Sequence, residues 1–330
     1  MRRVATWCAL VLTAATSALA WGADPAAPAS PAPLPDLHIL PVQGNISMLV
    51  GAGGNITVQT GSDGVLLVDT GLATMSDKVL AAVRSLSDRP IRYIINTHVH
   101  PDHVGGNEAV SKSGRTIAGG NVVGDIGNSA SSQATIIAFQ TVLDRMSTPV
   151  AGVTAAQAAW PTDTYTTPER KIFFNNEGVE MIHIPAAHTD GDTIVFFRRS
   201  DVISSGDIFV TNGYPIVDLD RGGNIQGVIA GLNRIVEMAI PADEQEGGTL
   251  IIPGHGRLCD VADVVYYQEM VIIIRDRIQN MIGKGMTLDQ VLAAKPTSDY
   301  DPRYGSSSGF WTTDKFVTAV YRSLSPGRNP

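Results

Sequence analysis

The chain has 330 residues, and 44% of them are hydrophobic, which is enough for one large core or two smaller ones. Its formal net charge is −8 at pH 7, and its pI is near 5.3. An acidic chain without a cluster of Lys or Arg argues against nucleic acid and anionic membranes as partners. We therefore expect the partner to be a small-molecule substrate.

The first 20 residues have the pattern of a secretory signal peptide. Arg2 and Arg3 form a charged start, Val4–Ala15 is a largely apolar run, and Ser17–Ala20 offers a small-x-small cleavage site. Because the apolar run is too short for an ordinary transmembrane helix, we expect cleavage, a periplasmic or secreted protein, and no stable membrane anchor afterwards. An uncleaved anchor is the alternative. Residues 21–36 form a Pro- and Ala-rich leader.

The sequence contains two cysteines, Cys8 and Cys259. Signal cleavage would remove Cys8, so an exported protein could form no internal disulfide. Its stability must then come from core packing and, plausibly, from bound metal. Cys259 follows a candidate metal ligand, His255, by four residues, but a buried, inert thiol is the favoured interpretation.

From residue 37 onward, the apolar pattern alternates between strand and helix. We expect one α/β domain over residues 37–330, with mixed sheets, outer helices, and C-terminal helices from about residue 261. The predicted strands are Ser47–Val50, Ile56–Thr60, Val65–Val68, Ile91–Asn96, Lys171–Phe174, Val179–Ile184, Thr193–Phe197, Val202–Ser204 and Leu250–Ile252. The predicted helices are Asp77–Leu86, one near Asn107, Ser129–Met146, Ile225–Met238, Val261–Ile282, a short one with a Thr287–Gln290 capping box, and Thr313–Leu324.

Residues 148–170 lack a regular pattern and contain three prolines. A loop of this length in a compact domain is usually functional or disordered, so we expect the segment 125–170 to cover the functional site. Trp160 and Tyr165 are candidate pocket walls, with core packing as the alternative. Tyr214 and Pro215 are a second candidate wall.

The segment Thr97–His103 packs three imidazoles and one carboxylate into a short stretch. His98 and His100 are two residues apart, so on an extended chain their side chains leave from the same side and can hold one ion. Asp102 and His103 follow where the chain turns into the next element, and they can point at a second ion. This spacing predicts a hydrolase that holds a water between two metals.

Three further candidate ligands follow predicted strands. His188 comes after Val179–Ile184, Asp207 after Val202–Ser204, and His255 after Leu250–Ile252. In layered α/β folds, loops at strand ends share one edge of the sheet, and sites gather there.

The order His-x-His-x-Asp-His, then His188, Gly-Asp207 and Gly-His255, resembles the metallo-β-lactamase superfamily from about Leu49 to Gly256. Val68-Asp69-Thr70-Gly71 matches its early aspartate motif. The resemblance implies a four-layer αββα sandwich. By that resemblance, one metal is bound by His98, His100 and His188, the other by Asp102, His103 and His255, and Asp207 bridges both. Two zinc ions suit these N and O ligands best, although manganese or iron also fits.

Other residues have smaller expected roles. Asp69 ends an apolar strand and should orient a ligand imidazole, whereas Asp192 could do the same or simply form a turn. We expect His183 to be structural and His38 to be solvated. Ser307 lies in a Gly-x-Ser-x-Gly string without the preceding strand of a nucleophile elbow, so we predict a flexible loop there.

The expected function is an exported dinuclear zinc hydrolase that uses a metal-bound hydroxide, with Asp102 orienting the nucleophile. Its substrate would be a small amide, lactone or ester, possibly a β-lactam. Some lactamases of the superfamily carry Cys or Ser where this chain has Asp207, so it looks more similar to the glyoxalase II, lactonase and phosphodiesterase branches. The alternatives are a thioester or phosphodiester hydrolase, a non-catalytic periplasmic metal-binding protein, and an iron oxidoreductase.

Overall fold

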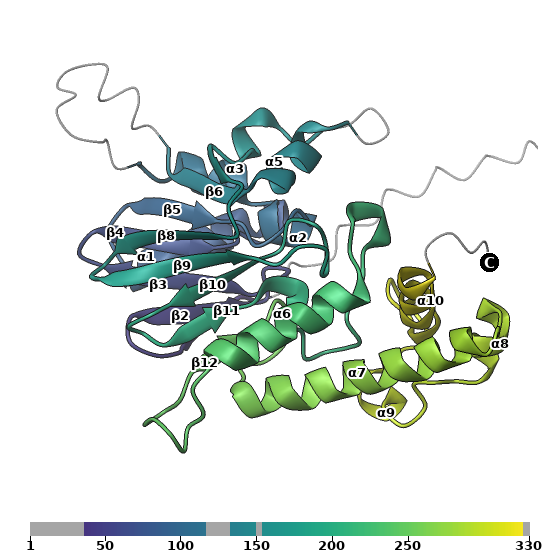
Figure 1. Cartoon of the computed structure of the whole chain (residues 1–330). Coiled ribbons are helices and arrows are strands. Elements are labelled where there is room, and N and C mark those ends of the chain that lie inside the picture. The colour runs from purple at the N-terminus through teal and green to yellow at the C-terminus, as the bar shows by residue number, and fades with distance from the viewer. Residues whose placement is uncertain (1–35, 117–132, 150–153, 326–330) are drawn as a thin grey trace, which may run out of the picture. The chain divides into compact units, whose positions relative to one another are not determined.

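Two β-sheets face each other in the computed structural model, which describes residues 36–116, 133–149 and 154–325 (Figure 1). The larger sheet has the order β1-β2-β3-β4-β5-β6-β7 and the smaller one β12-β11-β10-β9-β8. In the larger sheet, β1 to β4 pair antiparallel and β4 to β7 pair parallel. In the smaller sheet, only β11 and β12 pair parallel.

The strands are short. Those of the larger sheet are β1 His38–Pro41, β2 Ile46–Val50, β3 Ile56–Gly61, β4 Gly64–Val68, β5 Ile91–Ile95, β6 Thr135–Phe139 and β7 Asp163–Tyr165. Those of the smaller sheet are β8 Glu169–Phe174, β9 Glu177–His183, β10 Thr193–Phe197, β11 Val202–Ser204 and β12 Leu250–Ile252.

Strand β4 shows why the sheets are stacked. All of its residues are buried, because alternate side chains face opposite layers. Leu66 and Val68 pack between the sheets against residues such as Met181 and Phe197. Val65 and Leu67 pack on the other face with Val79 and other residues of helix α1 (Ser76–Leu86).

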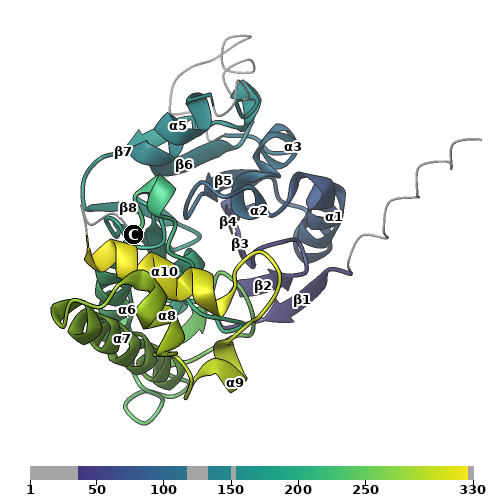
Figure 2. The ribbon, with the colours of Figure 1, turned by 90° about the vertical axis from the view of Figure 1, so that its right-hand side faces the viewer.

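Helices cover both outer faces, so the chain forms the predicted four-layer αββα sandwich. In Figure 2, α1 and α3 lie on one side and α6, α7, α8 and α10 on the other. The second group packs with Ile194, Ile203 and Ile251 of the smaller sheet. The remaining helices are α2 Pro101–Val104, α3 Asn107–Lys112, α5 Gln140–Ser147, α6 Ile225–Met238, α7 Val261–Gly283, α8 Leu288–Ala293, α9 Asp301–Tyr304 and α10 Thr313–Leu324, with 3-10 turns η1 Ala73–Met75, η2 Gln157–Ala159, η3 Gly206–Ile208 and η4 Leu219–Arg221.

Most predicted elements are confirmed within one or two residues, including the capping box of Thr287 and Gln290. The predicted helix Ser129–Met146 is wrong. Residues 129–132 lie outside the described chain, and Thr135–Phe139 is strand β6, paired with β5 and β7. Its β-branched residues favour a strand, and only Gln140–Ser147 is helical. The irregular stretch 148–170 also contains β7 and the start of β8, and the edge strand β1 was not predicted.

No helix within the described ranges combines the length and apolar character needed to cross a membrane.

The buried position of Phe316 in α10 gives a test of this packing. Its side chain is fully buried and stacks on Tyr214, with ring centroids 4.6 Å apart. We expect Phe316→Ala to lower the free energy of unfolding by about 3–5 kcal/mol, because it leaves a cavity in a packed core. Phe310, which is 80% exposed, provides the matched control, and Phe310→Ala should cost less than about 1 kcal/mol. Urea unfolding compares the two; equal losses would contradict the packing of α10 described above.

Candidate metal centre

The segment His98–His103 follows β5 and runs into the first turn of α2. His100 has extended backbone angles, φ −68° and ψ 146°, because Pro101 follows it and starts α2. The extended stretch sends two imidazoles to one side. The first turn of α2 then carries Asp102 and His103.

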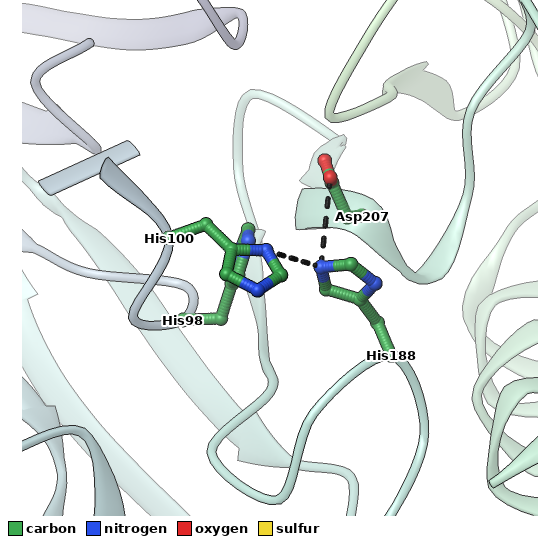
Figure 3. A group of neighbouring side chains, drawn as sticks. All are labelled: His98, His100, His188 and Asp207. Atoms are coloured by element: carbon green, nitrogen blue, oxygen red, sulfur yellow. Dashed lines mark hydrogen bonds and ion pairs between the residues drawn. The ribbon is translucent and has the colours of Figure 1, made fainter. Parts of the chain in front are cut away.

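All seven predicted ligand residues lie together, in two groups. The ligand atoms of His98, His100, His188 and Asp207 are within 4.8 Å of one another, and so are those of Asp102, His103 and His255. Figure 3 shows the first group, with the imidazoles of His98, His100 and His188 converging beside Asp207. Asp207 lies between the groups, because its carboxylate is 3.2 Å from Nε2 of His103 and 3.7 Å from Nε2 of His188.

Each of four imidazoles has one ring nitrogen held by the protein, and the other nitrogen faces the site. Such anchoring fixes the orientation of the ring and its tautomer. The anchoring pairs are His98 Nδ1 with Thr97 Oγ1 (3.0 Å), His100 Nε2 with Asp218 Oδ2 (2.8 Å), His103 Nδ1 with Asp69 Oδ2 (2.8 Å) and His188 Nδ1 with the Ile216 carbonyl (2.7 Å).

The acceptors determine which nitrogens carry lone pairs. The Ile216 carbonyl can only accept, so Nδ1 of His188 donates and its Nε2 has a lone pair. The Thr97 hydroxyl already donates to Asp69, so Nδ1 of His98 donates to it. Nε2 of His98 and Nε2 of His188 therefore offer lone pairs within the group that also contains His100 and Asp207.

This arrangement fits a bound cation. Nε2 of His188 is 2.8 Å from Nδ1 of His100, an approach that requires a proton or a metal ion between the two ring nitrogens. Among the described residues, the buried atom Nε2 of His98 has no hydrogen-bond partner, which costs about 1–3 kcal/mol. One proton could serve only two of these three nitrogens, whereas one metal ion could serve all three together with the Asp207 carboxylate.

The two groups differ in protonation. Burial lowers the pKa of His188 to about 4 and that of His98 well below its usual range, so both rings are neutral ligands at pH 7. In the other group, burial is outweighed by hydrogen bonds to Asp102 and Asp207, which raise the pKa of His255 to about 9. Asp207 and Asp69 likewise raise the pKa of His103 despite its burial. A metal must displace protons from the second group.

A cavity of about 1010 Å³ opens beside the candidate ligands and is lined by His100, Asp102, Asp207 and His255. The expectation that segment 125–170 covers the site is wrong for its described parts, which contribute no lining residue. Other walls of the cavity come from residues 210–221 and 304–322.

Of the four residues predicted to line the pocket, one lines the cavity and three pack elsewhere. Trp160 donates from its indole to the Ala155 carbonyl and packs beside Val142. Tyr165 is buried, with its hydroxyl 2.8 Å from Thr193, so both follow the core-packing alternative. Tyr214 lines the cavity as predicted, whereas Pro215 is buried and its carbonyl accepts from the Trp311 indole.

Three residues near the candidate ligands were expected to have smaller roles, either orienting a ligand or stabilising the fold. Asp69 contacts His103 as predicted and also accepts from the backbone and hydroxyl of Thr97. Asp192 accepts from the backbone and hydroxyl of Thr189, which is the turn role. His183 stacks on Phe139, with centroids 3.4 Å apart, and is structural.

Cys259 is buried, and burial raises the pKa of its thiol to about 12. It belongs to neither group of potential metal ligands found in the described chain, which agrees with an inert thiol. His38 is exposed on β1, and Ser307 is exposed with no strand before it, as predicted.

Asp218 is the site residue that the sequence did not reveal. Its carboxylate holds Nε2 of His100 and also accepts from the backbone and guanidinium of Arg221. These hydrogen bonds outweigh burial and lower the pKa of Asp218. It stands 118 residues from His100 in the chain, in an ordinary Asp-Leu-Asp-Arg-Gly-Gly turn, so no local pattern marks it.

The chain belongs to the metallo-beta-lactamase superfamily, whose family model matches residues 49–255. This match confirms the resemblance and includes all seven candidate ligands. The family's members are hydrolases that are typically metal-dependent.

One alkylsulfatase is similar to this chain in sequence, and a second is similar in fold. The linear primary-alkylsulfatase of Pseudomonas sp. (strain ATCC 19151) is 25% identical over 244 residues, which is 66% of this chain and 45% of that protein. The structure of the sec-alkylsulfatase Pisa1 from Pseudomonas sp. matches with a TM-score of 0.64 at 15% identity. The match covers 87% of this chain and 50% of the Pisa1 chain. The chain thus spans about half the length of these alkylsulfatases.

The structure of DIM-1 metallo-beta-lactamase has a TM-score of 0.53 at 15% identity. This match covers 72% of this chain and 98% of the DIM-1 chain. Identity this low shows a shared fold.

Replacing Asp218 tests its contact with His100. We expect Asp218→Asn to weaken zinc binding about 10- to 100-fold, because an uncharged amide holds the imidazole less firmly. Asp220→Asn is the matched control, since Asp220 is exposed two residues away and should leave zinc affinity within about twofold. Competition with a fluorescent zinc chelator measures both affinities. If the two variants bind zinc equally well, Asp218 does not orient His100.

Proposed function

We propose that the protein is an exported hydrolase that holds two zinc ions and cleaves a small amide, lactone or ester. The observation that carries this proposal is the convergence of three imidazoles and a carboxylate, with the buried Nε2 of His98 lacking a hydrogen-bond partner among the described residues. Manganese or iron would suit the same ligands. A non-catalytic metal-binding protein would need a closed site, whereas here the cavity reaches four of the candidate ligands.

His98, His100 and His188 would hold one ion, and Asp102, His103 and His255 the other. Asp207 would be shared, because its two oxygens face both groups. When bound, such ions supply Lewis acidity and an activated water at neutral pH. The anchored imidazoles keep their lone pairs in place without reorganisation during the reaction.

Asp102 is the residue best placed to act on the reacting water. Its side chain is 33% exposed and lines the cavity, while Oδ2 is 3.2 Å from Nε2 of His255. The hydrogen bond with His255 outweighs burial and lowers the pKa of Asp102, so its carboxylate is ionised at pH 7. It would accept a hydrogen bond from the attacking water, orient it, and take up its proton.

The cavity volume, about 1010 Å³, suits a small-molecule substrate. A sulfuric ester is a second candidate, because the primary-alkylsulfatase of Pseudomonas is 25% identical over 244 residues. β-Lactams, thioesters and phosphodiesters complete the set to be tested.

Substitution of His100 tests the proposed function. We expect the His100→Ala variant to bind less than stoichiometric zinc, because one of the candidate ligands is removed. We also expect its kcat/KM to fall at least about 100-fold. Metal analysis and a panel of 4-nitrophenyl acetate, 4-nitrophenyl sulfate, a lactone and a chromogenic cephalosporin measure the two effects.

His38→Ala is the control, since His38 is exposed on β1 away from the candidate ligands; it should keep both zinc and activity. A purified protein without stoichiometric metal, whose hydrolysis survives His100→Ala, would falsify the proposal. Full zinc loading with no turnover of any substrate would favour the non-catalytic alternative.

Export is supported by the sequence pattern of residues 1–20. We expect the protein recovered from the periplasm or medium to begin at Trp21. Mass spectrometry of its N-terminal peptide tests this, and a cell-associated protein that still begins at Met1 would contradict cleavage.

A further inference from the structure

One face of helix α10 forms part of the cavity wall. Lys315, Thr318, Ala319 and Arg322 line the cavity, together with Thr313 at the start of the helix. The first four follow the three- and four-residue spacing that places side chains on one side of a helix. The opposite stripe, Phe316, Val317 and Val320, is buried in the core with α6 and α7, as the grouping of these helices in Figure 2 shows. The polar face is therefore held in place by a packed apolar face.

This face carries two positive charges with spare hydrogen-bonding capacity. Arg322 is exposed, and no carboxylate in the described ranges forms an ion pair with its guanidinium. Lys315 donates to the Phe310 carbonyl at 2.7 Å, which leaves two of its three donors for a ligand. Arg221, the third cation of the cavity, is engaged by Asp218.

The acidic groups of the cavity do not neutralise these cations. Asp102 and Asp207 pair with imidazoles, and Asp218 pairs with His100 and Arg221. Asp220 is the exposed carboxylate of the lining, and it forms no ion pair with Lys315 or Arg322 in the described chain. Since the whole chain has a net charge of −8, a local pair of cations is needed to hold an anion at this surface.

Apolar surface lies beside the cations. Phe310 lines the cavity with 80% of its surface exposed, and its ring lies 5.6 Å from Nζ of Lys315. Trp311 also lines the cavity, with its indole N–H fixed on the Pro215 carbonyl. An exposed aromatic side chain beside a site is typical of ligand contact.

We propose that α10 forms an anion subsite, and that the substrate carries a carboxylate or sulfonate-like group on an apolar body, separate from the bond that is cleaved. Lys315 and Arg322 bind the anion, and Phe310 and Trp311 contact the body. The inference rests on the proposed hydrolase function, because the scissile group binds at the metal ligands and the anion at α10. Within the described ranges, neither cation pairs with the candidate ligands Asp102 or Asp207, so neither is neutralised by them.

Two ester probes test the subsite with the zinc-loaded enzyme. Mono-(4-nitrophenyl) succinate carries a remote carboxylate, and 4-nitrophenyl butyrate does not. We expect Lys315→Gln and Arg322→Gln each to lower the ratio of kcat/KM for the anionic over the neutral ester about fivefold, mainly through KM, as expected for one partly exposed ion pair. Lys284→Gln is the charge-matched control; Lys284 is exposed outside the cavity, so the ratio should stay as in the unmodified enzyme.

A binding measurement separates the subsite from catalysis. Titration calorimetry with naphthalene-2-sulfonate should show weaker binding to both α10 variants than to Lys284→Gln. If the sulfonate affinity falls in this way but neither ester is hydrolysed, the proposed function fails and the subsite stands. The opposite result is also possible: both esters are hydrolysed, every variant keeps the same ratio of kcat/KM for the anionic over the neutral ester, and the sulfonate affinity is unchanged. In that case the subsite is overturned and the hydrolase function stands.

Discussion

Two ring nitrogens that face each other create the constraint on which this site depends. Nε2 of His188 and Nδ1 of His100 are 2.8 Å apart, and each ring is fixed from behind by an acceptor, the Ile216 carbonyl or the Asp218 carboxylate. The rings cannot turn away without breaking those hydrogen bonds. Only positive charge between them makes the arrangement stable, so the protein scaffold holds the ligands against their mutual repulsion.

The sandwich supplies the rigidity that this requires. His98 follows β5 in the larger sheet, whereas Asp207 and His255 follow β11 and β12, parallel neighbours in the smaller one. Their strand ends approach so closely that a Cβ on Gly254 would lie 1.9 Å from Oδ1 of Asp207. Gly206 has φ +52°, a conformation that side chains disfavour. Backbone without side chains at these two points lets the groups share one carboxylate.

The sequence predicted which side chains cluster better than it predicted the elements around them. Spacing and strand-end position identified all seven candidate ligands, because both are local properties of the chain. Asp218 escaped prediction, since only folding brings it to His100. Thr135–Phe139 was misassigned because a short apolar run fits a helix or a strand, and its pairing with β5 and β7 decides the outcome. The wall formed by α10 likewise depends on tertiary packing.

The candidate metal ligands and much of the cavity wall come from different parts of the chain. The candidate ligands lie between His98 and His255, while much of the remaining cavity wall comes from residues 304–322. The stack of Phe316 on Tyr214 joins that wall to the loop that leads to Asp218. Polar changes on the exposed face of α10 leave this stack and the ligand anchors untouched. Substrate preference can therefore vary while the geometry of the metal ligands is kept.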